Sequence, residues 1–348
     1  SAELVTESFE GVRAKVAEFV GAGQDEIIFT SGSTEGINFV ADAWGRQNIG
    51  VDDEIIVTEA EHHANLLPWL RLSERVGAKI VYIPINSDSF KLDFDQTLLN
   101  ERTKLVAVTH SSNVLGNIWN PGDFSRLIGL AKDCGAKVLV DAAQSVPHQK
   151  VDVRSLGADF LVFSGHKIMG PTGIGVLYIN SDLFGQVEPY KVGGAMVHSA
   201  LPGKLRWKDA PHKFEAGTPP IAQVVGLGAA IDYMNEKIDF RALREHENEL
   251  CSDIVDFLSS YPSVSLFGSE DERHLVTFAV KGLHAHDLAA SCGENDVMIR
   301  AGHHCAQLLH EKLDVVATAR ISVFCYNTKR DVDQFKEAFE KACKVFGV

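Results

Sequence analysis

A lysine in an unusually apolar setting is the residue whose chemistry stands out first. Lys167 ends the segment Ser164-Gly165-His166-Lys167, directly after the apolar run Phe160–Ser164. Desolvation lowers the pKa of a lysine and favours Schiff-base chemistry with a carbonyl compound. A lysine whose stem packs on a strand end while its ammonium group reaches water is an equally good interpretation. Nearby Ser164 and His166 would both reach a phosphate.

A second segment combines small residues with hydroxyl groups. Ser31-Gly32-Ser33-Thr34-Glu35-Gly36 follows the apolar run Ile27–Thr30 and precedes a helical pattern. Small residues let the backbone approach an anion, and the first turn of a helix offers free N–H groups. The segment is therefore either a phosphate cradle, with Ser33 and Thr34 as hydroxyl donors, or an ordinary helix cap. It is not a Walker loop, because the lysine of that motif is missing.

A carboxylate and an imidazole follow two other apolar runs. Asp141 closes the run Lys137–Asp141, where a buried carboxylate is costly unless it is paired or hydrogen-bonded. A pyridinium N–H would be a fitting partner, and an ion pair or a cap is the alternative. His62 suits stacking on a ring-shaped cofactor. A metal site at His62 and His63 is disfavoured, because neighbours on an extended segment point in opposite directions and zinc needs two further ligands.

Together these groups match the needs of one cofactor. A phosphate clamp, a flat imidazole, a buried carboxylate and a lysine in a hydroxyl-rich turn are what pyridoxal 5'-phosphate requires. Each group follows a strand-like run, so all of them are expected at one edge of a sheet. The sequence therefore predicts an enzyme that holds pyridoxal 5'-phosphate through Lys167.

A thiol in an unusual loop lies in the last third of the chain. Cys305 stands in Arg300-Ala301-Gly302-His303-His304-Cys305-Ala306, beside histidines and near an arginine, where a thiolate is favoured. A small core hydrophobe is the alternative. That alternative suits Cys134, Cys251 and Cys343, which fall in helical patterns, better than it suits this loop. A zinc knuckle is disfavoured, because no second cluster of cysteines and histidines exists.

Two further residues are candidates for binding a substrate. Arg320 precedes an apolar run, and an arginine entering a strand can hold a carboxylate with two hydrogen bonds. An internal salt bridge explains Arg320 equally well. Asn113 follows the run Leu105–Thr109 and offers an amide to a ligand, although a turn-forming asparagine is the simpler interpretation.

The elements that must position these residues are short apolar strands that alternate with helices. Strands are predicted at Ile27–Thr30, Glu54–Thr58, Lys79–Ile83, Leu105–Thr109, Lys137–Asp141, Phe160–Ser164 and Gly175–Ile179. Helices are predicted between them at Glu35–Gly45, Leu67–Val76 and Asp123–Cys134. This alternation indicates an α/β sheet that is covered on both faces.

Beyond Gly217 the pattern of predicted helices and strands changes, and the new pattern predicts a smaller α+β unit. Its predicted elements are helices at Pro219–Met234, Phe240–Ser259, His286–Glu294 and Asp331–Phe346 and a strand at Leu275–Val280. We predict a large cofactor-binding domain at residues 1–232 and a small domain, carrying the cysteine loop, at residues 233–348.

Composition excludes several classes of protein. The net charge is −14 and no basic stripe exists, which argues against nucleic acid or an anionic membrane as a partner. No apolar run approaches the roughly 20 residues that cross a bilayer. The segment from Ser1 to Phe19 is typical of an amphipathic helix and not of a signal peptide. Six scattered cysteines without a C-x-x-C pair indicate reduced thiols and a cytoplasmic setting.

Six segments together resemble the group II cysteine desulfurases of the SufS and CsdA type. This group is a branch of the class V aminotransferases and has the fold of type I pyridoxal-phosphate enzymes, with a mainly parallel seven-stranded sheet and a smaller C-terminal domain. The segments occur in order along nearly the whole chain: Thr30-Ser31-Gly32-Ser33-Thr34-Glu35-Gly36, Glu61-His62-His63-Ala64-Asn65, Val140-Asp141-Ala142-Ala143-Gln144, Ser164-Gly165-His166-Lys167, Glu215-Ala216-Gly217-Thr218-Pro219 and Arg300-Ala301-Gly302-His303-His304-Cys305-Ala306.

The resemblance implies a role for each candidate residue. Lys167 would hold the cofactor covalently, and His62 would stack on its ring. Asp141 would pair with the ring nitrogen, and Gln144 would contact the phenolic oxygen. The residues implied to hold the phosphate are Ser33, Thr34, Ser164, His166 and, in the neighbouring subunit of a homodimer, Thr218. Those implied to position the substrate carboxylate are Asn113, Arg320 and Arg300, while Cys305 is the implied nucleophile.

The implied reaction converts L-cysteine to L-alanine and leaves the sulfur as a persulfide on Cys305. A SufE- or CsdE-like protein, or a reductant, would then accept the sulfur for iron–sulfur cluster assembly or other sulfur traffic. The short Gly-His-His-Cys context resembles group II and not the longer cysteine loop of group I.

Two departures from the family pattern keep alternatives open. Family members carry a further N-terminal segment with an Asn-x-His-Arg motif that helps to close the active site, and Gln307-Leu308-Leu309 replaces a more usual Gln-Pro. The alternatives are a selenocysteine lyase acting on L-selenocysteine, another class V enzyme such as a kynureninase that needs no thiol at Cys305, and a catalytically impaired member that only binds a partner.

Overall fold

Seven strands form the larger sheet of the molecule. The computed structural model describes residues 2–269 and 273–348, and within these residues the strand order is β1-β7-β6-β5-β4-β2-β3. β7 is antiparallel to β1 and β6, whereas the remaining pairs are parallel, so every strand except β7 runs in the same direction. The strands are β1 (Ile27–Thr30), β2 (Glu54–Thr58), β3 (Lys79–Ile83), β4 (Thr103–Thr109), β5 (Lys137–Asp141), β6 (Phe160–Ser164) and β7 (Gly175–Ile179). The predicted mainly parallel sheet is confirmed, and only β4 begins earlier than predicted.

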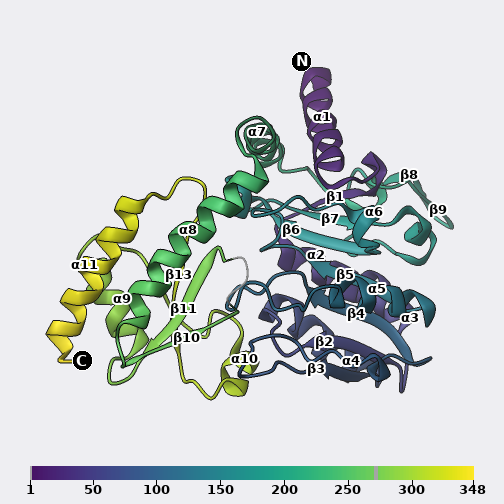
Figure 1. Cartoon of the computed structure of the whole chain (residues 1–348). Coiled ribbons are helices and arrows are strands. Elements are labelled where there is room, and N and C mark those ends of the chain that lie inside the picture. Colours follow the sequence, from purple (N-terminus) through teal and green to yellow (C-terminus); the bar gives the residue numbers. More distant parts are fainter. Residues whose placement is uncertain (1, 270–272) are drawn as a thin grey trace.

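Helices cover both faces of this sheet because alternate residues of each strand point to opposite sides. Val106 and Val138 join one hydrophobic cluster, and their neighbours Leu105 and Leu139 join the other. α1 (Ala2–Val20), α5 (Asp123–Asp133) and α7 (Ile221–Lys237) pack on the first face, and α2 (Ser33–Val40) and α4 (Leu67–Val76) pack on the second. Figure 1 shows these layers.

The helical stretch predicted at Glu35–Gly45 starts before Glu35 and continues past Gly45 into the short helix α3 (Arg46–Asn48). It begins as α2, and after Val40 it widens into the π-helical turn η2 (Ala41–Gly45). At Gly45 an added Cβ would lie 2.6 Å from Leu72 Cδ2, so α4 packs directly on the backbone there. The N-terminal helix, predicted from Ser1 to Phe19, is α1; Ser1 lies outside the described residues.

A second, antiparallel sheet has the order β10-β11-β13-β12. Its strands are β10 (Val264–Phe267), β11 (Leu275–Val280), β12 (Arg300–Gly302) and β13 (Thr318–Ser322). Its apolar face shares one cluster with α8 (Phe240–Ser259), α9 (Ala285–Gly293) and α11 (Lys329–Phe346). Only β11 of these strands was predicted. The predicted domain boundary at residue 233 falls inside α7 and stays a prediction.

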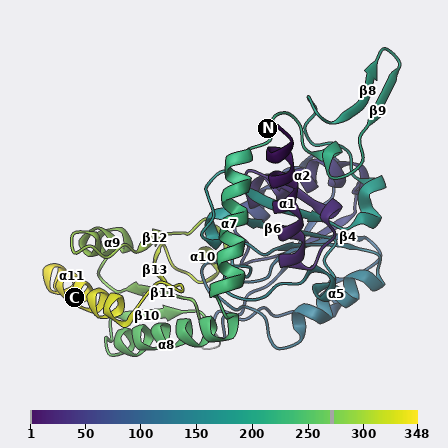
Figure 2. The ribbon, with the colours of Figure 1, turned by 90° about the horizontal axis from the view of Figure 1, so that it is seen from above.

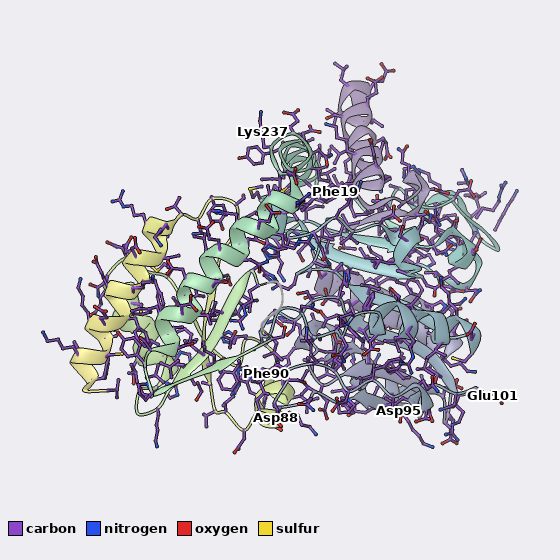
Figure 3. The ribbon with its side chains drawn as sticks, viewed as in Figure 1. Phe19, Asp88, Phe90, Asp95, Glu101 and Lys237 are labelled. Carbon is purple, nitrogen blue, oxygen red and sulfur yellow. The ribbon has the colours of Figure 1, made fainter. Side chains whose placement is uncertain are left out.

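Contacts between the two sheets run along one side of the larger sheet. Phe90, which follows β3 in the chain, packs edge-to-face on Phe267 at the end of β10, with ring centroids 6.0 Å apart. Figure 3 shows Phe90 at this boundary. The short helix α10 (Gln307–Lys312) also belongs to the boundary, because Leu309 is fully buried in a cluster of the larger sheet although α10 lies between β12 and β13 in the chain.

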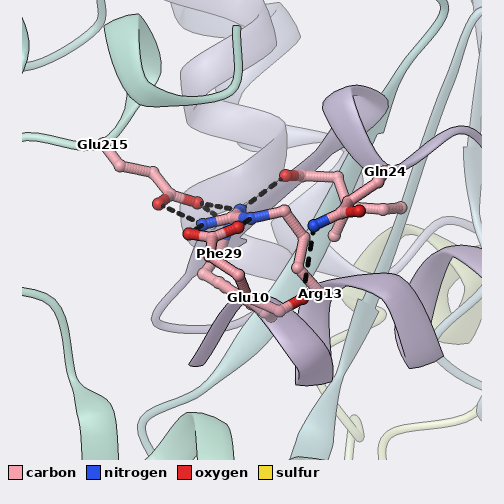
Figure 4. Close-up of polar contacts among 6 residues, drawn as sticks. Glu10, Arg13, Gln24, Phe29 and Glu215 are labelled. Atoms are coloured by element: carbon pink, nitrogen blue, oxygen red, sulfur yellow. Dashed lines mark hydrogen bonds and ion pairs between the residues drawn. The ribbon is translucent and has the colours of Figure 1, made fainter. Parts of the chain in front are cut away.

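α1 is fixed to the sheet by a buried arginine. Arg13 is fully buried and donates from Nη1 to Glu215 Oε1 at 2.7 Å and to the Ile27 carbonyl at 2.8 Å. Glu215 Oε1 also accepts the Phe29 N–H at 2.7 Å, as Figure 4 shows. This network joins α1, β1 and the segment that leads to α7. Figure 2 shows α1 and α7 side by side. In the described part of the chain, no helix has both the length and the apolar character needed to cross a bilayer.

Candidate active site

The carboxyl ends of the parallel strands surround a cavity of about 250 Å3. Because these strands run in the same direction, residues that follow β1, β2, β4, β5 and β6 meet at one edge of the sheet. Two arginines of the second sheet close the cavity. The cavity brings together the predicted residues Ser33, Thr34, His62, Asn113, Asp141, Gln144, Ser164, His166, Lys167, Arg300 and Arg320.

The hydroxyl groups of the predicted phosphate cradle lie within hydrogen-bonding distance of one another. The Ser33 N–H donates to Ser164 Oγ at 2.9 Å, and the two hydroxyl oxygens are 2.8 Å apart. Gly32 has a φ of 155°, and a Cβ added at Gly175 of β7 would lie 2.4 Å from Gly32 Cα. The start of α2 therefore rests backbone to backbone on β7, with its free N–H groups facing the edge where Ser164 ends β6. This arrangement suits a phosphate.

Asp141 and Lys167 form the polar centre of the cavity. Asp141 is buried, and its carboxylate accepts the Ala143 N–H at 3.0 Å. Burial raises the pKa of Asp141, while the charge of Lys167 opposes that shift. Burial lowers the pKa of Lys167 against the opposing charge of Asp141, and two nearby arginines lower it further. The site therefore favours a neutral, nucleophilic amine and leaves a buried carboxylate suited to a cationic ring nitrogen.

His62 presents a neutral imidazole to the cavity. Its Nδ1 accepts the Ala64 N–H at 3.0 Å, so the neutral ring carries its proton on Nε2. Burial and then the charge of Lys167 lower the pKa of His62 to about 4. The ring is uncharged at neutral pH and is suited to stacking against an aromatic cofactor.

The residue before His62 is a buried glutamate whose role the sequence pattern did not predict. Glu61 is almost fully buried and accepts from the Thr109 N–H at 2.9 Å, the Asn65 amide at 2.7 Å and the Thr58 hydroxyl at 2.8 Å. Burial, with a smaller effect of Asp141, raises the pKa of Glu61 to about 8. The signal that singled out Asp141, a carboxylate just after an apolar strand, applies equally to Glu61.

Two arginines of the second sheet line one side of the cavity. Arg300 and Arg320 are Cα partners on β12 and β13. Arg320 donates from Nη1 to the Asn113 carbonyl at 2.7 Å, and its buried Nε has no partner in the described part of the chain. Burial and the charge of Arg300 lower the pKa of Arg320 to about 10. Among residues 2–269 and 273–348, neither arginine forms an ion pair with an acidic side chain, so the internal salt bridge considered for Arg320 is not found.

Cys305 lies at the rim of this cavity without lining it. Its Sγ is 3.6 Å from Arg300 Nη2, and its carbonyl accepts the His63 N–H at 2.7 Å. The Asn113 side chain donates to the carbonyl of His304 at 2.7 Å. The thiol is thus fixed beside residues that do line the cavity.

The turn at residues 303–306, called the Cys305 turn below, is supported by hydrogen bonds that connect two neutral imidazole rings, those of His304 and His310, through Thr318. His310 Nδ1 donates to the Ala306 carbonyl at 2.9 Å, so its Nε2 must accept from the Thr318 hydroxyl at 3.0 Å. Thr318 Oγ1 then accepts from His304 Nε2, also at 3.0 Å. Burial lowers the pKa of His304 to about 3, which keeps this ring neutral.

Thr218 lies apart from the other predicted residues. It is exposed and lines a different cavity of about 600 Å3, together with Ser31, Glu35 and Lys191. Glu35 accepts the Ser31 N–H at 2.6 Å and pairs with Lys191, so this cavity borders the outer side of the predicted phosphate cradle.

The structure adds two observations on metals and thiols. Within the described ranges, no three His, Cys, Asp or Glu side chains gather as a set that could hold a metal ion. All six cysteines are free, with Cys251, Cys292 and Cys343 buried and Cys305 partly accessible.

Comparison of the sequence with known proteins gives consistent results. The family model for class-V aminotransferases matches residues 1–335. A probable cysteine desulfurase of Halalkalibacterium halodurans is 44% identical over 99% of this chain and 84% of its own length. A cysteine desulfurase of Haloferax volcanii is 42% identical over 97% of this chain and 80% of its own length.

Solved structures resemble the whole fold. The cysteine desulfurase CsdA of Escherichia coli, in an S-sulfonic acid form, superposes with a TM-score of 0.94 at 38% identity and covers 99% of this chain and 86% of its own. The apo cysteine desulfurase of Thermococcus onnurineus gives a TM-score of 0.92, also at 38% identity, with 99% of this chain and 85% of its own covered.

Proposed function

Because the chain belongs to the class-V aminotransferase family, and within it to the cysteine desulfurases, we propose that it converts L-cysteine to L-alanine and collects the sulfur on Cys305. The observation that carries the proposal is the position of this thiol. Cys305 Sγ lies 3.6 Å from Arg300 Nη2, at the rim of the cavity that also holds Lys167 and Asp141. A thiol in that place has a use in sulfur removal and none in a simple amino transfer.

The lining of the cavity fits pyridoxal 5'-phosphate, the cofactor implied by this family. Ser33, Thr34, Ser164 and His166 would hold its phosphate, and Gln144 would contact its phenolic oxygen. Asp141 would pair with the ring nitrogen, His62 would stack on the ring, and Lys167 would hold the cofactor covalently. When bound, the cofactor supplies an electron sink for bonds that break at the carbon atoms of an amino acid.

The protein's own groups would orient the substrate and move its protons. Arg320 and Arg300 would bind the carboxylate of L-cysteine, with the Asn113 amide beside them. The neutral amine of Lys167, favoured by burial, would take the proton from the substrate Cα and return it during formation of alanine. Neutral His62 adds no charge that would oppose the cationic ring.

Cys305 would then receive the sulfur in a balanced step. Its thiolate attacks the substrate sulfur, an S–S bond forms and the carbon–sulfur bond breaks. The electron pair of that bond stays with the carbon, which is protonated to give alanine. One thiol and one cysteine thus become one persulfide and one alanine without an external oxidant. A thiol or a protein acceptor must remove the terminal sulfur before the next turnover.

Further proposals concern the assembly and its setting. Exposed apolar residues on α1 and α7 support a homodimer formed through these helices: Leu4, Val5, Ile221, Val225 and Tyr233. Val5 and Ile221 line the cavity that contains Thr218, which would reach the phosphate site of the second subunit. A SufE- or CsdE-like acceptor, a role in iron–sulfur cluster assembly and a cytoplasmic location are proposed from the family resemblance.

The decisive experiment measures products from the purified holoenzyme. L-cysteine with a reductant should give equal amounts of alanine and sulfide, and Cys305→Ser should keep the cofactor absorbance but form no persulfide. Cys134→Ser is the matched control and should leave the product ratio unchanged. Normal turnover by Cys305→Ser would contradict the proposal. L-selenocysteine in parallel would reveal a selenocysteine lyase if the serine variant still acts on it.

A further inference from the structure

The imidazole of His63 connects the cofactor side of the site to the thiol. We infer that His63 is a positioning residue, which holds the Cys305 turn in place through its neutral ring. The inference rests on the proposed role of Cys305 as the sulfur acceptor. His63 follows His62 directly in the chain, so the residue that would stack on the cofactor and the residue that would hold the nucleophile are adjacent.

His63 makes two hydrogen bonds to this region, one to Cys305 itself and one to Gln307, two residues further along the chain. The backbone N–H of His63 donates to the Cys305 carbonyl at 2.7 Å, and His63 Nε2 accepts the N–H of Gln307 at 3.2 Å. Gln307 opens α10, where backbone N–H groups lack partners within the helix. An accepting Nε2 must carry a lone pair, so the ring is neutral with its proton on Nδ1. A protonated imidazolium cannot make this contact.

The backbone of the turn needs such support from outside. His304 and Cys305 both have left-handed φ values, 53° and 59°, which L-residues rarely adopt and which persist only where neighbours hold them. The Ala306 N–H donates to the His303 carbonyl at 2.8 Å within the turn. Asn113 and His63, in the segments that follow β4 and β2, hold the turn backbone from the side of the larger sheet, and His310 holds the Ala306 carbonyl from α10.

α10 itself has independent anchors. Ala306 and Leu309 are fully buried against the larger sheet, and Lys312 Nζ lies 2.8 Å from Glu59 Oε1 at the end of β2. Loss of the His63 ring should therefore loosen the Cys305 turn without detaching α10. This separation makes a positioning role testable apart from folding.

The contact depends on pH with a definite sign. Burial and the charge of His303 lower the pKa of His63. In the described part of the chain, the other titratable groups on the contacting segments are His62, Cys305 and, on α10, His310 and Glu311. His310 lies 5.4 Å ring to ring from His303. The neutral ring is therefore present at neutral pH. Protonation on the acid side of the ordinary value of about 6.5 removes the acceptor for Gln307 and adds a charge beside His303.

The test compares His63→Ala and His63→Gln in the holoenzyme, with His198→Ala on the exposed hairpin of β8 (Val197–Leu201) as the control. The amide oxygen of glutamine can accept the Gln307 N–H and does not titrate. We expect His63→Ala to slow single-turnover persulfide formation roughly fivefold, the factor for one hydrogen bond of ordinary net strength. The cofactor spectrum and the binding of L-cysteine should not change.

His63→Gln should restore the rate of persulfide formation. The decrease of this rate at acid pH that is caused by protonation of His63 in the unsubstituted protein should be absent from this variant. An unchanged rate and pH profile in His63→Ala, or a His63→Gln variant as slow as His63→Ala, would overturn the inference. A lower melting temperature with normal transfer would show a structural role only and would also overturn it.

A second measurement keeps this test independent of the proposed activity. Cys305 should react with iodoacetamide faster in His63→Ala than in the unsubstituted protein, judged by mass spectrometry against Cys134 as internal reference. If the unsubstituted protein forms no persulfide, the proposed function fails, while a changed Cys305 reactivity still supports the positioning role. An equal Cys305 reactivity in both proteins would count against it.

Discussion

Arg300 and Arg320 face each other as partners on β12 and β13, and within the described residues no carboxylate pairs with either guanidinium. Two neighbouring cations repel each other, and the charge of Arg300 helps to lower the pKa of Arg320 to about 10. The protein keeps this unfavourable pair beside a cavity that contains Lys167 and Asn113. An anionic substrate that binds both arginines would relieve the repulsion.

Arg320→Gln should therefore weaken substrate binding and spare the fold. We expect the KM for L-cysteine to rise roughly 10-fold or more, because a charge-assisted hydrogen bond is worth about 1.5–3 kcal/mol. The free energy of unfolding should not fall, because the substitution also removes the charge repulsion between Arg320 and Arg300. Steady-state kinetics and the cofactor spectrum check this, with the exposed Arg330→Gln as control. An unchanged KM would remove Arg320 from the substrate site.

Lys167→Ala should abolish both covalent attachment of the cofactor and product formation. Lys167 is the only lysine that lines the 250 Å3 cavity in the part of the chain that the structure describes. The visible absorbance of the attached cofactor should be lost, and borohydride reduction of the unsubstituted protein should label the peptide that contains Lys167. The exposed Lys344→Ala should behave as the unsubstituted protein. A label on any other lysine would contradict the assignment.

The strands of the larger sheet could be predicted because each contains an apolar run, and all except the edge strand β3 are almost entirely buried on both faces. The cavity followed from them, since Asp141 ends β5 while Lys167 and Ser33 follow β6 and β1, and these three strands run in one direction. β12 could not be predicted in the same way, because its three residues, Arg300–Gly302, carry no apolar pattern. Its pairing with β13, which sets Arg300 opposite Arg320, depends on residues far apart in the chain.

The contacts of His63 and Glu61 were beyond prediction for a related reason. Glu61 binds Thr58 and Asn65 within its own segment, but its third partner, Thr109, is 48 residues away. The Gln307 partner of the His63 ring is 244 residues away. Sequence spacing carries no information on such pairs. What could be inferred was that a carboxylate after an apolar strand must find partners, and this physical requirement is met at Glu61.

Glu61→Gln should become more stable relative to the unsubstituted protein as pH rises. The folded-state pKa of Glu61 is raised to about 8 by burial, above the ordinary value near 4.5, so the folded protein binds this proton more tightly than the unfolded chain does. Glu61 then loses stabilising effect between about pH 4.5 and pH 8, and a pKa difference of one corresponds to about 1.4 kcal/mol. Glutamine does not titrate.

Chemical denaturation of both proteins at pH 5, 6, 7, 8 and 9 checks this expectation. Between pH 5 and pH 8, the free energy of unfolding of Glu61→Gln should rise by at least about 1 kcal/mol relative to that of the unsubstituted protein. Above pH 8 the difference between the two proteins should stay constant. A pH-independent difference would mean that Glu61 is ionised throughout. Glu61→Ala should be less stable at every pH, because it leaves the Thr109 N–H and the Asn65 amide buried without their partner.

Arg13→Met should destabilise the protein far more than removal of a neighbouring surface pair. Arg13 is fully buried, and its loss leaves the Glu215 carboxylate, which is only 15% exposed, and the Ile27 carbonyl without their charged partner (Figure 4). Breaking a buried pair by removing one partner costs about 3–5 kcal/mol. Lys15→Met is the matched control, because Lys15 also lies on α1 and pairs with Asp232 of α7, but both of these side chains are nearly half exposed. That pair should contribute no more than about 1 kcal/mol.

Denaturation of the two variants under identical conditions separates these cases. If Arg13→Met and Lys15→Met lose equal stability, the buried network does not fix α1. Adding Glu215→Gln to Arg13→Met should recover part of the loss, since it removes the charge left unpaired while an amide oxygen can still accept the Phe29 N–H. A loss in the double variant equal to the sum of the two single losses would show instead that Glu215 supports this segment independently of Arg13.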